Sequence, residues 1–129
     1  MADSLKPELI QEFVGKAHGD LEVVQRLLGQ EPGLLNAAWD WGGGDWETAL
    51  GAAAHMGRID IANYLLEQGA SIDLFAAAML GKLEIVKAMI NDNPNLKNAR
   101  GPHTIPLMQH AKAGGDEAKS VVEFLESFS

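Results

Sequence analysis

Histidines are the side chains of this sequence that are best suited to metal binding or proton transfer, because imidazole does both near neutral pH. His55, His103 and His110 could in principle converge with nearby carboxylates. However, the sequence holds no His-x-x-His, His-x-x-x-His or His-Glu-x-x-His pair, and the three lie far apart along the chain. We therefore expect no metal site and no cofactor. His110 is predicted to be a hydrogen-bonded packing residue and His103 a turn residue.

The other common catalytic patterns do not occur in the sequence. No serine stands in a Gly-x-Ser-x-Gly elbow, and there is no cysteine to act as a nucleophile or thiolate ligand. The run Gly42-Gly43-Gly44 lacks the Lys-Ser or Lys-Thr that follows the glycines of a phosphate-binding loop, so we interpret it as a tight turn. We expect no catalytic residue and a protein that is not an enzyme.

Three tryptophans, Trp39, Trp41 and Trp46, lie in one short segment around these glycines. Tryptophan is enriched at binding anchors, which makes the segment a candidate contact for a protein or a sugar. A small domain seldom exposes several large rings, so we expect at least two of the three to fold back over the body, Trp46 before the others. The segment 39–46 is long enough for a projecting turn or β-hairpin.

Length and charge narrow the possible class of protein. The chain has 129 residues, which suits one domain, and it is 47% hydrophobic and 22% charged, as soluble folded proteins are. The net charge of −8 disfavours nucleic acid and anionic membrane surfaces as partners. No apolar run approaches the roughly 20 residues that cross a bilayer, and the opening residues do not resemble a signal peptide, so we expect a cytoplasmic protein.

A ten-residue block recurs along the chain and organises it. The block occurs at 19–28, 57–66 and 81–90, and each copy starts with glycine and continues with apolar residues in the same positions. Their spacing is that of a helix with one buried face. A looser fourth copy follows Gly114-Gly115. Alanine-rich segments before three of the glycines predict a helix that precedes the glycine. We expect the glycine to adopt the left-handed conformation and so to end that helix.

Each unit is therefore predicted to be a helix, a tight turn and a second helix. The units span approximately residues 5–37, 45–73, 74–98 and 101–129 of a single domain, 1–129. The second helices are expected to end at Glu31-Pro32-Gly33, at Gly69 and at Asn93-Pro94.

The second unit resembles the ankyrin repeat. Its segment 48–58, Thr-Ala-Leu-Gly-Ala-Ala-Ala-His-Met-Gly-Arg, is similar to the family pattern T-P-L-H-x-A-A-x-x-G-H, and 61–73 is similar to the second helix and exit of the repeat. The fourth unit keeps Pro106 and Leu107. The resemblance extends over nearly the whole chain. It implies an all-α fold, an α-solenoid of about four ankyrin-like helix-turn-helix repeats with irregular, partly missing β-turn or hairpin connectors.

Several positions depart from the ankyrin pattern. Ala49 replaces the helix-starting proline, and Gly51 and Met108 replace the histidine that ties adjacent hairpins together. The third unit lacks the turn segment before Ala76. We expect this gap to leave a notch between the tryptophan segment 39–46 and the turn at 101–103.

The resemblance implies a non-enzymatic protein–protein interaction module, which binds its partner through the concave face and the inter-repeat turns. The net charge favours a partner with a basic or apolar surface, and we expect a monomer. The residues assigned to partner binding, from family positions and from the tryptophan segment, are His18, Trp39, Trp41, Asp45, Glu47, His55, Met56, Met79, Leu80, His103, Thr104 and Lys112.

Two other functions stay open at this point. The tryptophan segment 39–46 and His103 could line a pocket at the notch, in a small-molecule or carbohydrate binder or a hydrolase. Alternatively, the apolar residues Phe124, Leu125 and Phe128 at the end of the fourth unit could serve self-assembly.

Overall fold

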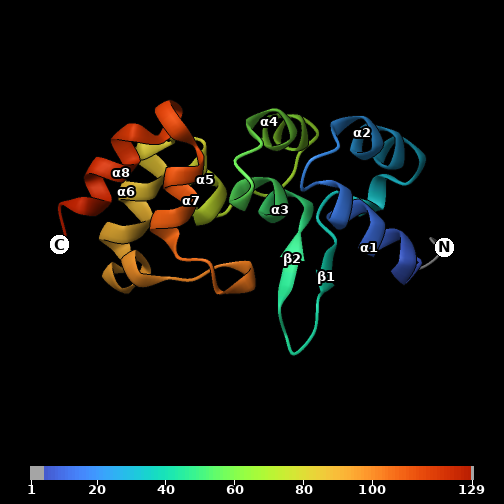
Figure 1. Ribbon diagram of the computed structural model, residues 1–129, viewed down its shortest axis with the longest axis horizontal. Helices are drawn as coiled ribbons and strands as arrows, with labels where there is room; N and C mark the ends of the chain where they lie inside the picture. The colour runs from blue at the N-terminus through green and yellow to red at the C-terminus, as the bar shows by residue number, and fades with distance from the viewer. Residues whose placement is uncertain (1–4, 129) are drawn as a thin grey trace.

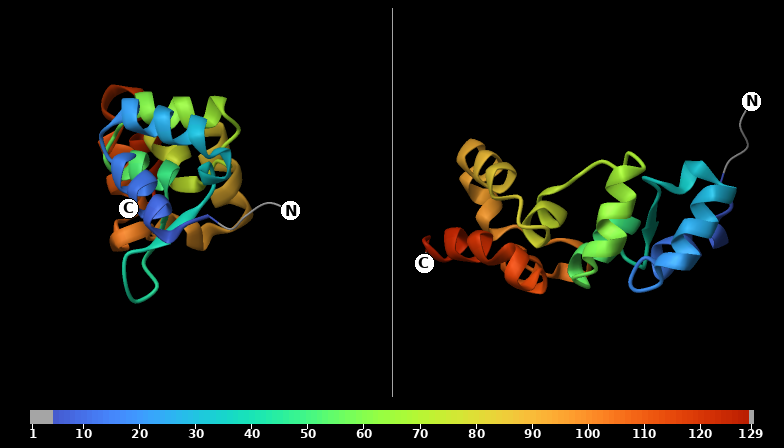
Figure 2. Two further views of the ribbon diagram at one scale, coloured as in Figure 1. Left: turned by 90° about the vertical axis from the view of Figure 1, so that its right-hand side faces the viewer. Right: turned by 90° about the horizontal axis from the view of Figure 1, so that it is seen from above.

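The computed structural model describes residues 5–128, and these residues fold into eight α-helices in four pairs (Figure 1). Along the long axis, α1 and α2 lie at one end, α3 and α4 lie in the middle, and α5 to α8 lie together at the other end. Seen from above, the molecule is elongated (Figure 2). The pairs are α1 (Pro7–Lys16) with α2 (Leu21–Gln30), α3 (Ala49–His55) with α4 (Ile59–Glu67), α5 (Leu74–Met79) with α6 (Leu83–Asp92), and α7 (Leu107–Ala113) with α8 (Lys119–Glu126).

The helices form two layers. In the first layer, α1 contacts α3, α3 contacts α5, and α5 contacts α7, while in the second layer α2 contacts α4 and α6 contacts α8. Short 3-10 helices lie in the connections: η1 (Pro32–Leu34), η2 (Pro94–Asn98), η3 (Pro102–Thr104) and η4 (Gly115–Ala118). Among the described residues, no helix is long and apolar enough to cross a membrane.

Side chains next to the helix starts account for several of the boundaries. Asp20, Thr48 and Asp73 each accept a hydrogen bond from the backbone N–H three residues later, at 3.2, 3.0 and 2.8 Å. These contacts satisfy N–H groups that the first turn of a helix leaves free. The second helices end where the sequence predicts, α2 at Gln30, α4 at Glu67 just before Gly69, and α6 at Asp92 before Asn93-Pro94.

The turn glycines follow the prediction in part. Gly57 and Gly81 have φ values of 66° and 72°, the left-handed conformation that was expected. The expectation is wrong for Gly114, which has a φ of −76°; the adjacent Gly115 has the positive φ instead, at 60°. Gly114 is required for space, since the carbonyl oxygen of Met79 occupies the place that a Cβ would take.

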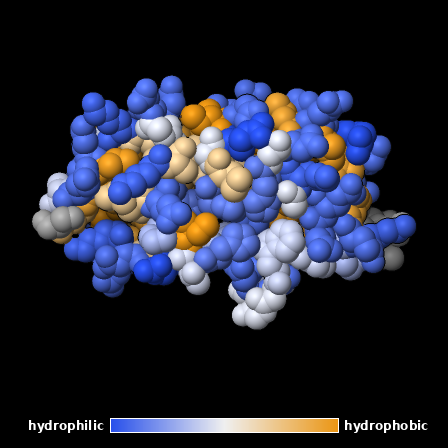
Figure 3. All heavy atoms as spheres, in the orientation of Figure 1, coloured by the Kyte–Doolittle hydropathy of each residue, from blue (hydrophilic) through white to orange (hydrophobic). Residues whose placement is uncertain are grey.

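The segment between the first two helix pairs forms a β-hairpin that projects from the helices (Figures 1 and 2). Its strands β1 (Ala38–Asp40) and β2 (Trp46–Thr48) are antiparallel, with Trp39 opposite Glu47. The carboxylate of Asp40 accepts hydrogen bonds from the N–H groups of Gly42 and Gly44, which closes the turn. In the space-filling view the projection carries residues of intermediate hydropathy (Figure 3). The predicted hairpin is confirmed.

The core consists of two apolar clusters, one for each half of the molecule. The first is built on α1 to α4 and includes Met79 of α5, and the second is built on α5 to α8. All six alanines at 52–54 and 76–78 are fully buried. Their small side chains suit a first layer in which neighbouring helices are short and close.

The predicted notch is wrong because its two sides are in contact. As expected, the connection 68–73 between α4 and α5 contains no strand. However, α3 also contacts α7, and the η3 turn lies against the β-hairpin, where Asp45 accepts a hydrogen bond from the His103 backbone N–H. Pro102 packs close to Gly51 of α3. The η3 turn thus fills the place that the missing third turn leaves.

Candidate functional site

Three histidines and a glutamate from distant parts of the chain meet at one point. His18 lies in the turn between α1 and α2, His55 is the last residue of α3, His103 lies in η3, and Glu47 is the middle residue of β2. Each offers one nitrogen or carboxylate oxygen, and these four atoms lie within 4.8 Å of one another. We call this group the histidine cluster.

Strand alternation places Glu47 at the centre of the histidine cluster. Side chains of a strand point alternately to opposite faces, and in β2 Trp46 is 60% exposed while Glu47 is 1% exposed. Burial of an ionised carboxylate is costly unless polar or charged partners surround it. Glu47 has such partners on both of its oxygens.

The distances around this carboxylate are short. Its Oε1 accepts a hydrogen bond of 2.9 Å from Nε1 of Trp41 and lies 3.2 Å from Nε2 of His18. Its Oε2 lies 3.1 Å from Nε2 of His55 and 3.2 Å from Nε2 of His103. All three imidazoles therefore present the same ring nitrogen to Glu47.

The opposite ring nitrogen is held by the protein in two of the three histidines. Nδ1 of His18 is 2.9 Å from the carbonyl oxygen of Gly15, and Nδ1 of His103 is 2.7 Å from Oδ2 of Asp45. These oxygens can only accept, so Nδ1 carries the hydrogen in both rings. Each Nε2 is then left with its lone pair directed toward the cluster when the ring is neutral.

Two buried atoms of the cluster have no hydrogen-bond partner. Oε2 of Glu47 and Nε2 of His55 face each other, but their geometry does not form a hydrogen bond. The side chain of Glu47 is fully buried and that of His55 is 11% exposed. Unpaired buried polar atoms are rare in native proteins and call for a physical explanation.

The pKa values of the cluster reflect these contacts. Burial acts to raise the pKa of Glu47, but interactions with His18, His55 and Trp41 outweigh it and hold the pKa at about 2. The hydrogen bond with Glu47 raises the pKa of His18. The backbone N–H of His103 lowers the pKa of Asp45. Glu47 and Asp45 are therefore anionic at neutral pH.

The backbone that carries His103 is unusual. His103 and the adjacent Thr104 have φ values of 61° and 60°, a conformation that residues other than glycine adopt infrequently and β-branched residues least of all. Such strain is often found where a side chain has to be held in one position. Here it directs the His103 ring between Asp45 and Glu47.

The structure brings half of the predicted site residues together and separates the rest. His18, Trp41, Asp45, Glu47, His55 and His103 form or border the histidine cluster. Outside it, Met56, Thr104 and Lys112 are exposed, and Trp39 and Leu80 are half-buried against the first core cluster. The placement of Met79 and Glu47 on a partner-facing surface is wrong, since Met79 fills the core and Glu47 is enclosed by the histidines.

The expectation that the tryptophans fold back over the body is confirmed for Trp39, which is half-buried against the first core cluster. Trp41 remains 37% exposed, although its ring lies against Gly15 of α1 and its Nε1 donates to Glu47. Trp46 was expected to fold back first, and this is wrong because it alternates with the buried Glu47 and so points outward.

The histidine interpretation is confirmed in part. His110 is a buried packing residue whose Nδ1 donates to the carbonyl oxygen of Pro106, and His103 does lie in a turn. The expectation that histidines in different units do not converge is wrong for His55 and His103. His18, which the sequence does not single out as a metal ligand, joins them. One signal was present in the sequence: His18 and His55 each stand one or two residues before a turn glycine, so the repeat places them in one row.

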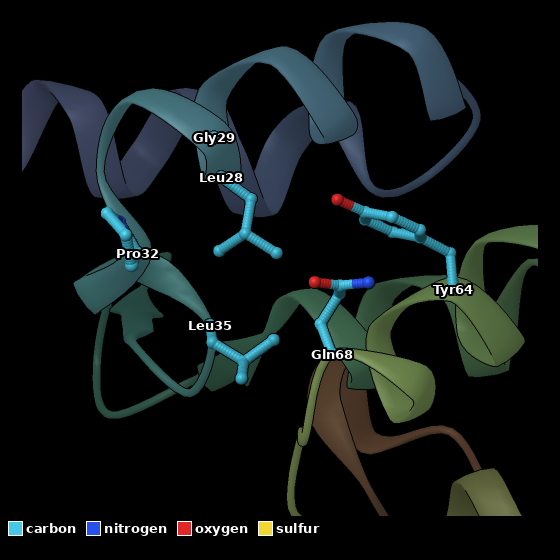
Figure 4. Close-up of a pocket in the computed structure, with 6 residues that line it drawn as sticks. All are labelled: Leu28, Gly29, Pro32, Leu35, Tyr64 and Gln68. Atoms are coloured by element: carbon cyan, nitrogen blue, oxygen red, sulfur yellow. The ribbon is translucent and has the colours of Figure 1, made fainter.

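Surface hollows lie outside the histidine cluster. One, of about 260 Å³, lies between α2 and α4 and is lined by Leu28, Leu35, Tyr64 and Gln68 among others (Figure 4). Another, of about 420 Å³, is lined by Trp41 and by polar residues of α1 such as Glu12. The alternative of a small-molecule or carbohydrate site at 39–46 and His103 stays a prediction.

Comparison with known proteins agrees with the helix pairs and turn glycines described above. The family model of the ankyrin repeat matches residues 45–75, which comprise β2, α3, α4 and the exit from α4. The chain therefore contains an ankyrin repeat, and Glu47 and His55 of the histidine cluster lie inside it. No curated protein matches the chain.

Proposed function

We propose that this protein is a non-enzymatic, monomeric binding domain, an α-solenoid of about four ankyrin-like repeats that binds another protein. The observation that supports it best is the ankyrin repeat at residues 45–75, since this repeat is generally a protein-binding module. Further support comes from the other helix pairs, whose first helices contact one another in series as α1, α3, α5 and α7. Stacked repeats of this kind present long surfaces for partners.

The exposed residues of the ankyrin repeat are the first candidates for partner contact. Trp46 is 60% exposed on β2, and Met56 is 52% exposed at the end of α3. Large exposed apolar side chains are typical anchors in protein interfaces, and methionine adapts to varied surfaces. The net charge of −8 favours a partner with a basic or apolar surface.

The test is affinity capture from native extract with the full chain as bait. The variant Trp46→Ala, Met56→Ser changes two exposed side chains and is expected to keep the fold. The matched control is Phe128→Ser, which removes a comparably exposed apolar side chain at the far end of the chain. We expect one stoichiometric protein that the double variant loses and the control retains. Retention of that protein by the double variant at unchanged affinity would contradict the proposed surface.

A further inference from the structure

The histidine cluster has the spacing of a metal coordination sphere. The three Nε2 atoms lie 3.1 to 3.2 Å from the nearest oxygen of Glu47. Ligands about 2.0 to 2.1 Å from a tetrahedral zinc ion are about 3.3 Å from one another. The four candidate ligand atoms, one from each side chain, lie within 4.8 Å of one another, so side-chain adjustments can place them around one ion.

The hydrogen bonds that hold the histidine rings in place are also typical of a metal site. Histidines that bind metals usually donate their other ring N–H to a carbonyl or carboxylate oxygen, which fixes the tautomer and aims the ligating nitrogen. His18 donates from Nδ1 to Gly15, and His103 donates from Nδ1 to Asp45, so Nε2 of each ring faces inward and offers a lone pair when the ring is neutral. The arrangement of Asp45 and His103 is the carboxylate–histidine pair that is common beside zinc.

A network of hydrogen bonds alone does not account for the whole cluster. It leaves Oε2 of Glu47 and Nε2 of His55 without partners although both are buried. One cation at the centre would satisfy both atoms. The cation would also offset the desolvation free energy of the fully buried, ionised carboxylate of Glu47.

We propose that His18, Glu47, His55 and His103 bind one divalent first-row transition-metal ion. Zinc is the ion that best fits a four-coordinate site of three imidazoles and a carboxylate, since zinc accepts nitrogen and oxygen ligands without a strong geometric demand of its own. With four protein ligands the site is closed, which is the arrangement of structural zinc.

The proposed ion joins three parts of the chain that lie far apart in the sequence. His18 belongs to the first helix pair, Glu47 and His55 to the ankyrin repeat, and His103 to the η3 turn before the last helix pair. One ion therefore ties the start of the helix row to its end on the side of the hairpin. This inference does not depend on the proposed protein partner, and its test requires no partner.

The test is isothermal titration of zinc chloride into the full chain, prepared without a histidine tag and freed of metal by chelation. We expect one zinc per chain. The variants His55→Gln and His103→Gln are expected to lose more than about 100-fold in affinity, and Asp45→Asn, which removes the partner of a ligand, about 10- to 100-fold. The matched control is His110→Gln, because His110 is the described histidine that lies outside the cluster and should bind zinc unchanged.

A second readout keeps the proposal testable if a variant does not fold, which circular dichroism detects. Cobalt(II) bound to the unaltered chain should show the intense visible absorption of a tetrahedral site, and one equivalent of zinc should abolish it. Failure of the unaltered chain to bind zinc at one per chain would overturn the proposal. Equal loss of affinity in His110→Gln and His55→Gln would also overturn it, since the binding would then not belong to this cluster.

Discussion

Asp45 holds His103 at two points, accepting its backbone N–H with Oδ1 and its ring Nδ1–H with Oδ2, both at 2.7 Å. The two residues are 58 positions apart, so the contact joins the β-hairpin to the turn before α7. It fixes the tautomer of His103 and aims Nε2 at Glu47. The Asp45–His103 contact thus closes the gap left by the third unit and at the same time completes the histidine cluster.

Zinc is expected to stabilise the folded protein. A ligand that binds the folded state alone stabilises it by about 2.7 kcal/mol at 100 times its dissociation constant. For a chain of this size this corresponds to a rise in melting temperature of roughly 10 °C. Differential scanning calorimetry with and without zinc measures the shift. The control His110→Gln should show the same rise, and His55→Gln little or none; an equal rise in both would contradict the assignment.

Gly81→Ala is expected to destabilise the fold by about 3 kcal/mol or more. Gly81 has a φ of 72°, and an added Cβ would overlap the carbonyl oxygen of Glu117. The matched control is Gly29→Ala. Gly29 lies in the exposed part of α2 with nothing near its missing Cβ, so alanine there should stabilise by about 0.5 to 1 kcal/mol. Urea denaturation compares the two, and a similar effect at both positions would show that close packing at Gly81 is not important.

The helix pairs could be predicted from the sequence because their information is local. Apolar spacing, alanine runs and turn glycines determine α3, α4, α5 and α6, and the breaks at Glu31 and Asn93 end the helices they follow. The ankyrin pattern in residues 48–58 adds the register of the second unit. Such patterns say where helices begin and end, and which face is buried.

The histidine cluster could not be predicted in this way, because it depends on packing between units. The connection 68–73 before α5 contains no strand, and η3 reaches the hairpin there and brings His103 to Glu47. Sequence spacing predicts a metal site only from ligands that lie a few positions apart in the chain. His18 and His103 are far apart in the sequence and meet only in the tertiary structure. The family position of Glu47 predicts a surface residue, and its burial becomes apparent only when β2 places it on the face opposite to Trp46.

His110 is expected to weaken the fold in mild acid. Burial lowers the pKa of His110 below the usual 6.5, and the nearby His55 lowers it further, while smaller effects of Pro106, Asp73 and Glu47 raise it. In the unfolded chain His110 takes up a proton near pH 6.5, whereas in the folded protein it does so only at lower pH. The titration of His110 therefore leaves the free energy of unfolding unchanged above about pH 6.5. Below this pH it lowers the free energy of unfolding, until the pH reaches the pKa of His110 in the folded protein.

The measurement is urea denaturation at several pH values between neutral and mildly acidic. The variant His110→Gln removes the titrating group, so its stability should fall less with acid than that of the unaltered chain. Nuclear magnetic resonance of the His110 ring should show a pKa below 6.5. A ring that titrates above this value would contradict the account.

Thr104→Asn is expected to stabilise the fold by about 1 kcal/mol. Thr104 is β-branched at a φ of 60°, which costs roughly 1 to 2 kcal/mol relative to its preferred conformations, and asparagine tolerates this region better. The side chain of Thr104 is exposed, and its carbonyl oxygen would still accept from Arg100. Thermal unfolding measures the change; a clear loss of stability would show that the threonine side chain itself supports the turn.

The most direct test of the central claim is a crystal structure of the chain grown with one equivalent of zinc, with data collected on both sides of the zinc absorption edge. The account predicts one strong anomalous peak about 2.0 to 2.1 Å from Nε2 of His18, His55 and His103 and from a carboxylate oxygen of Glu47. A zinc ion bound elsewhere, with the histidine cluster unchanged and empty, would contradict it.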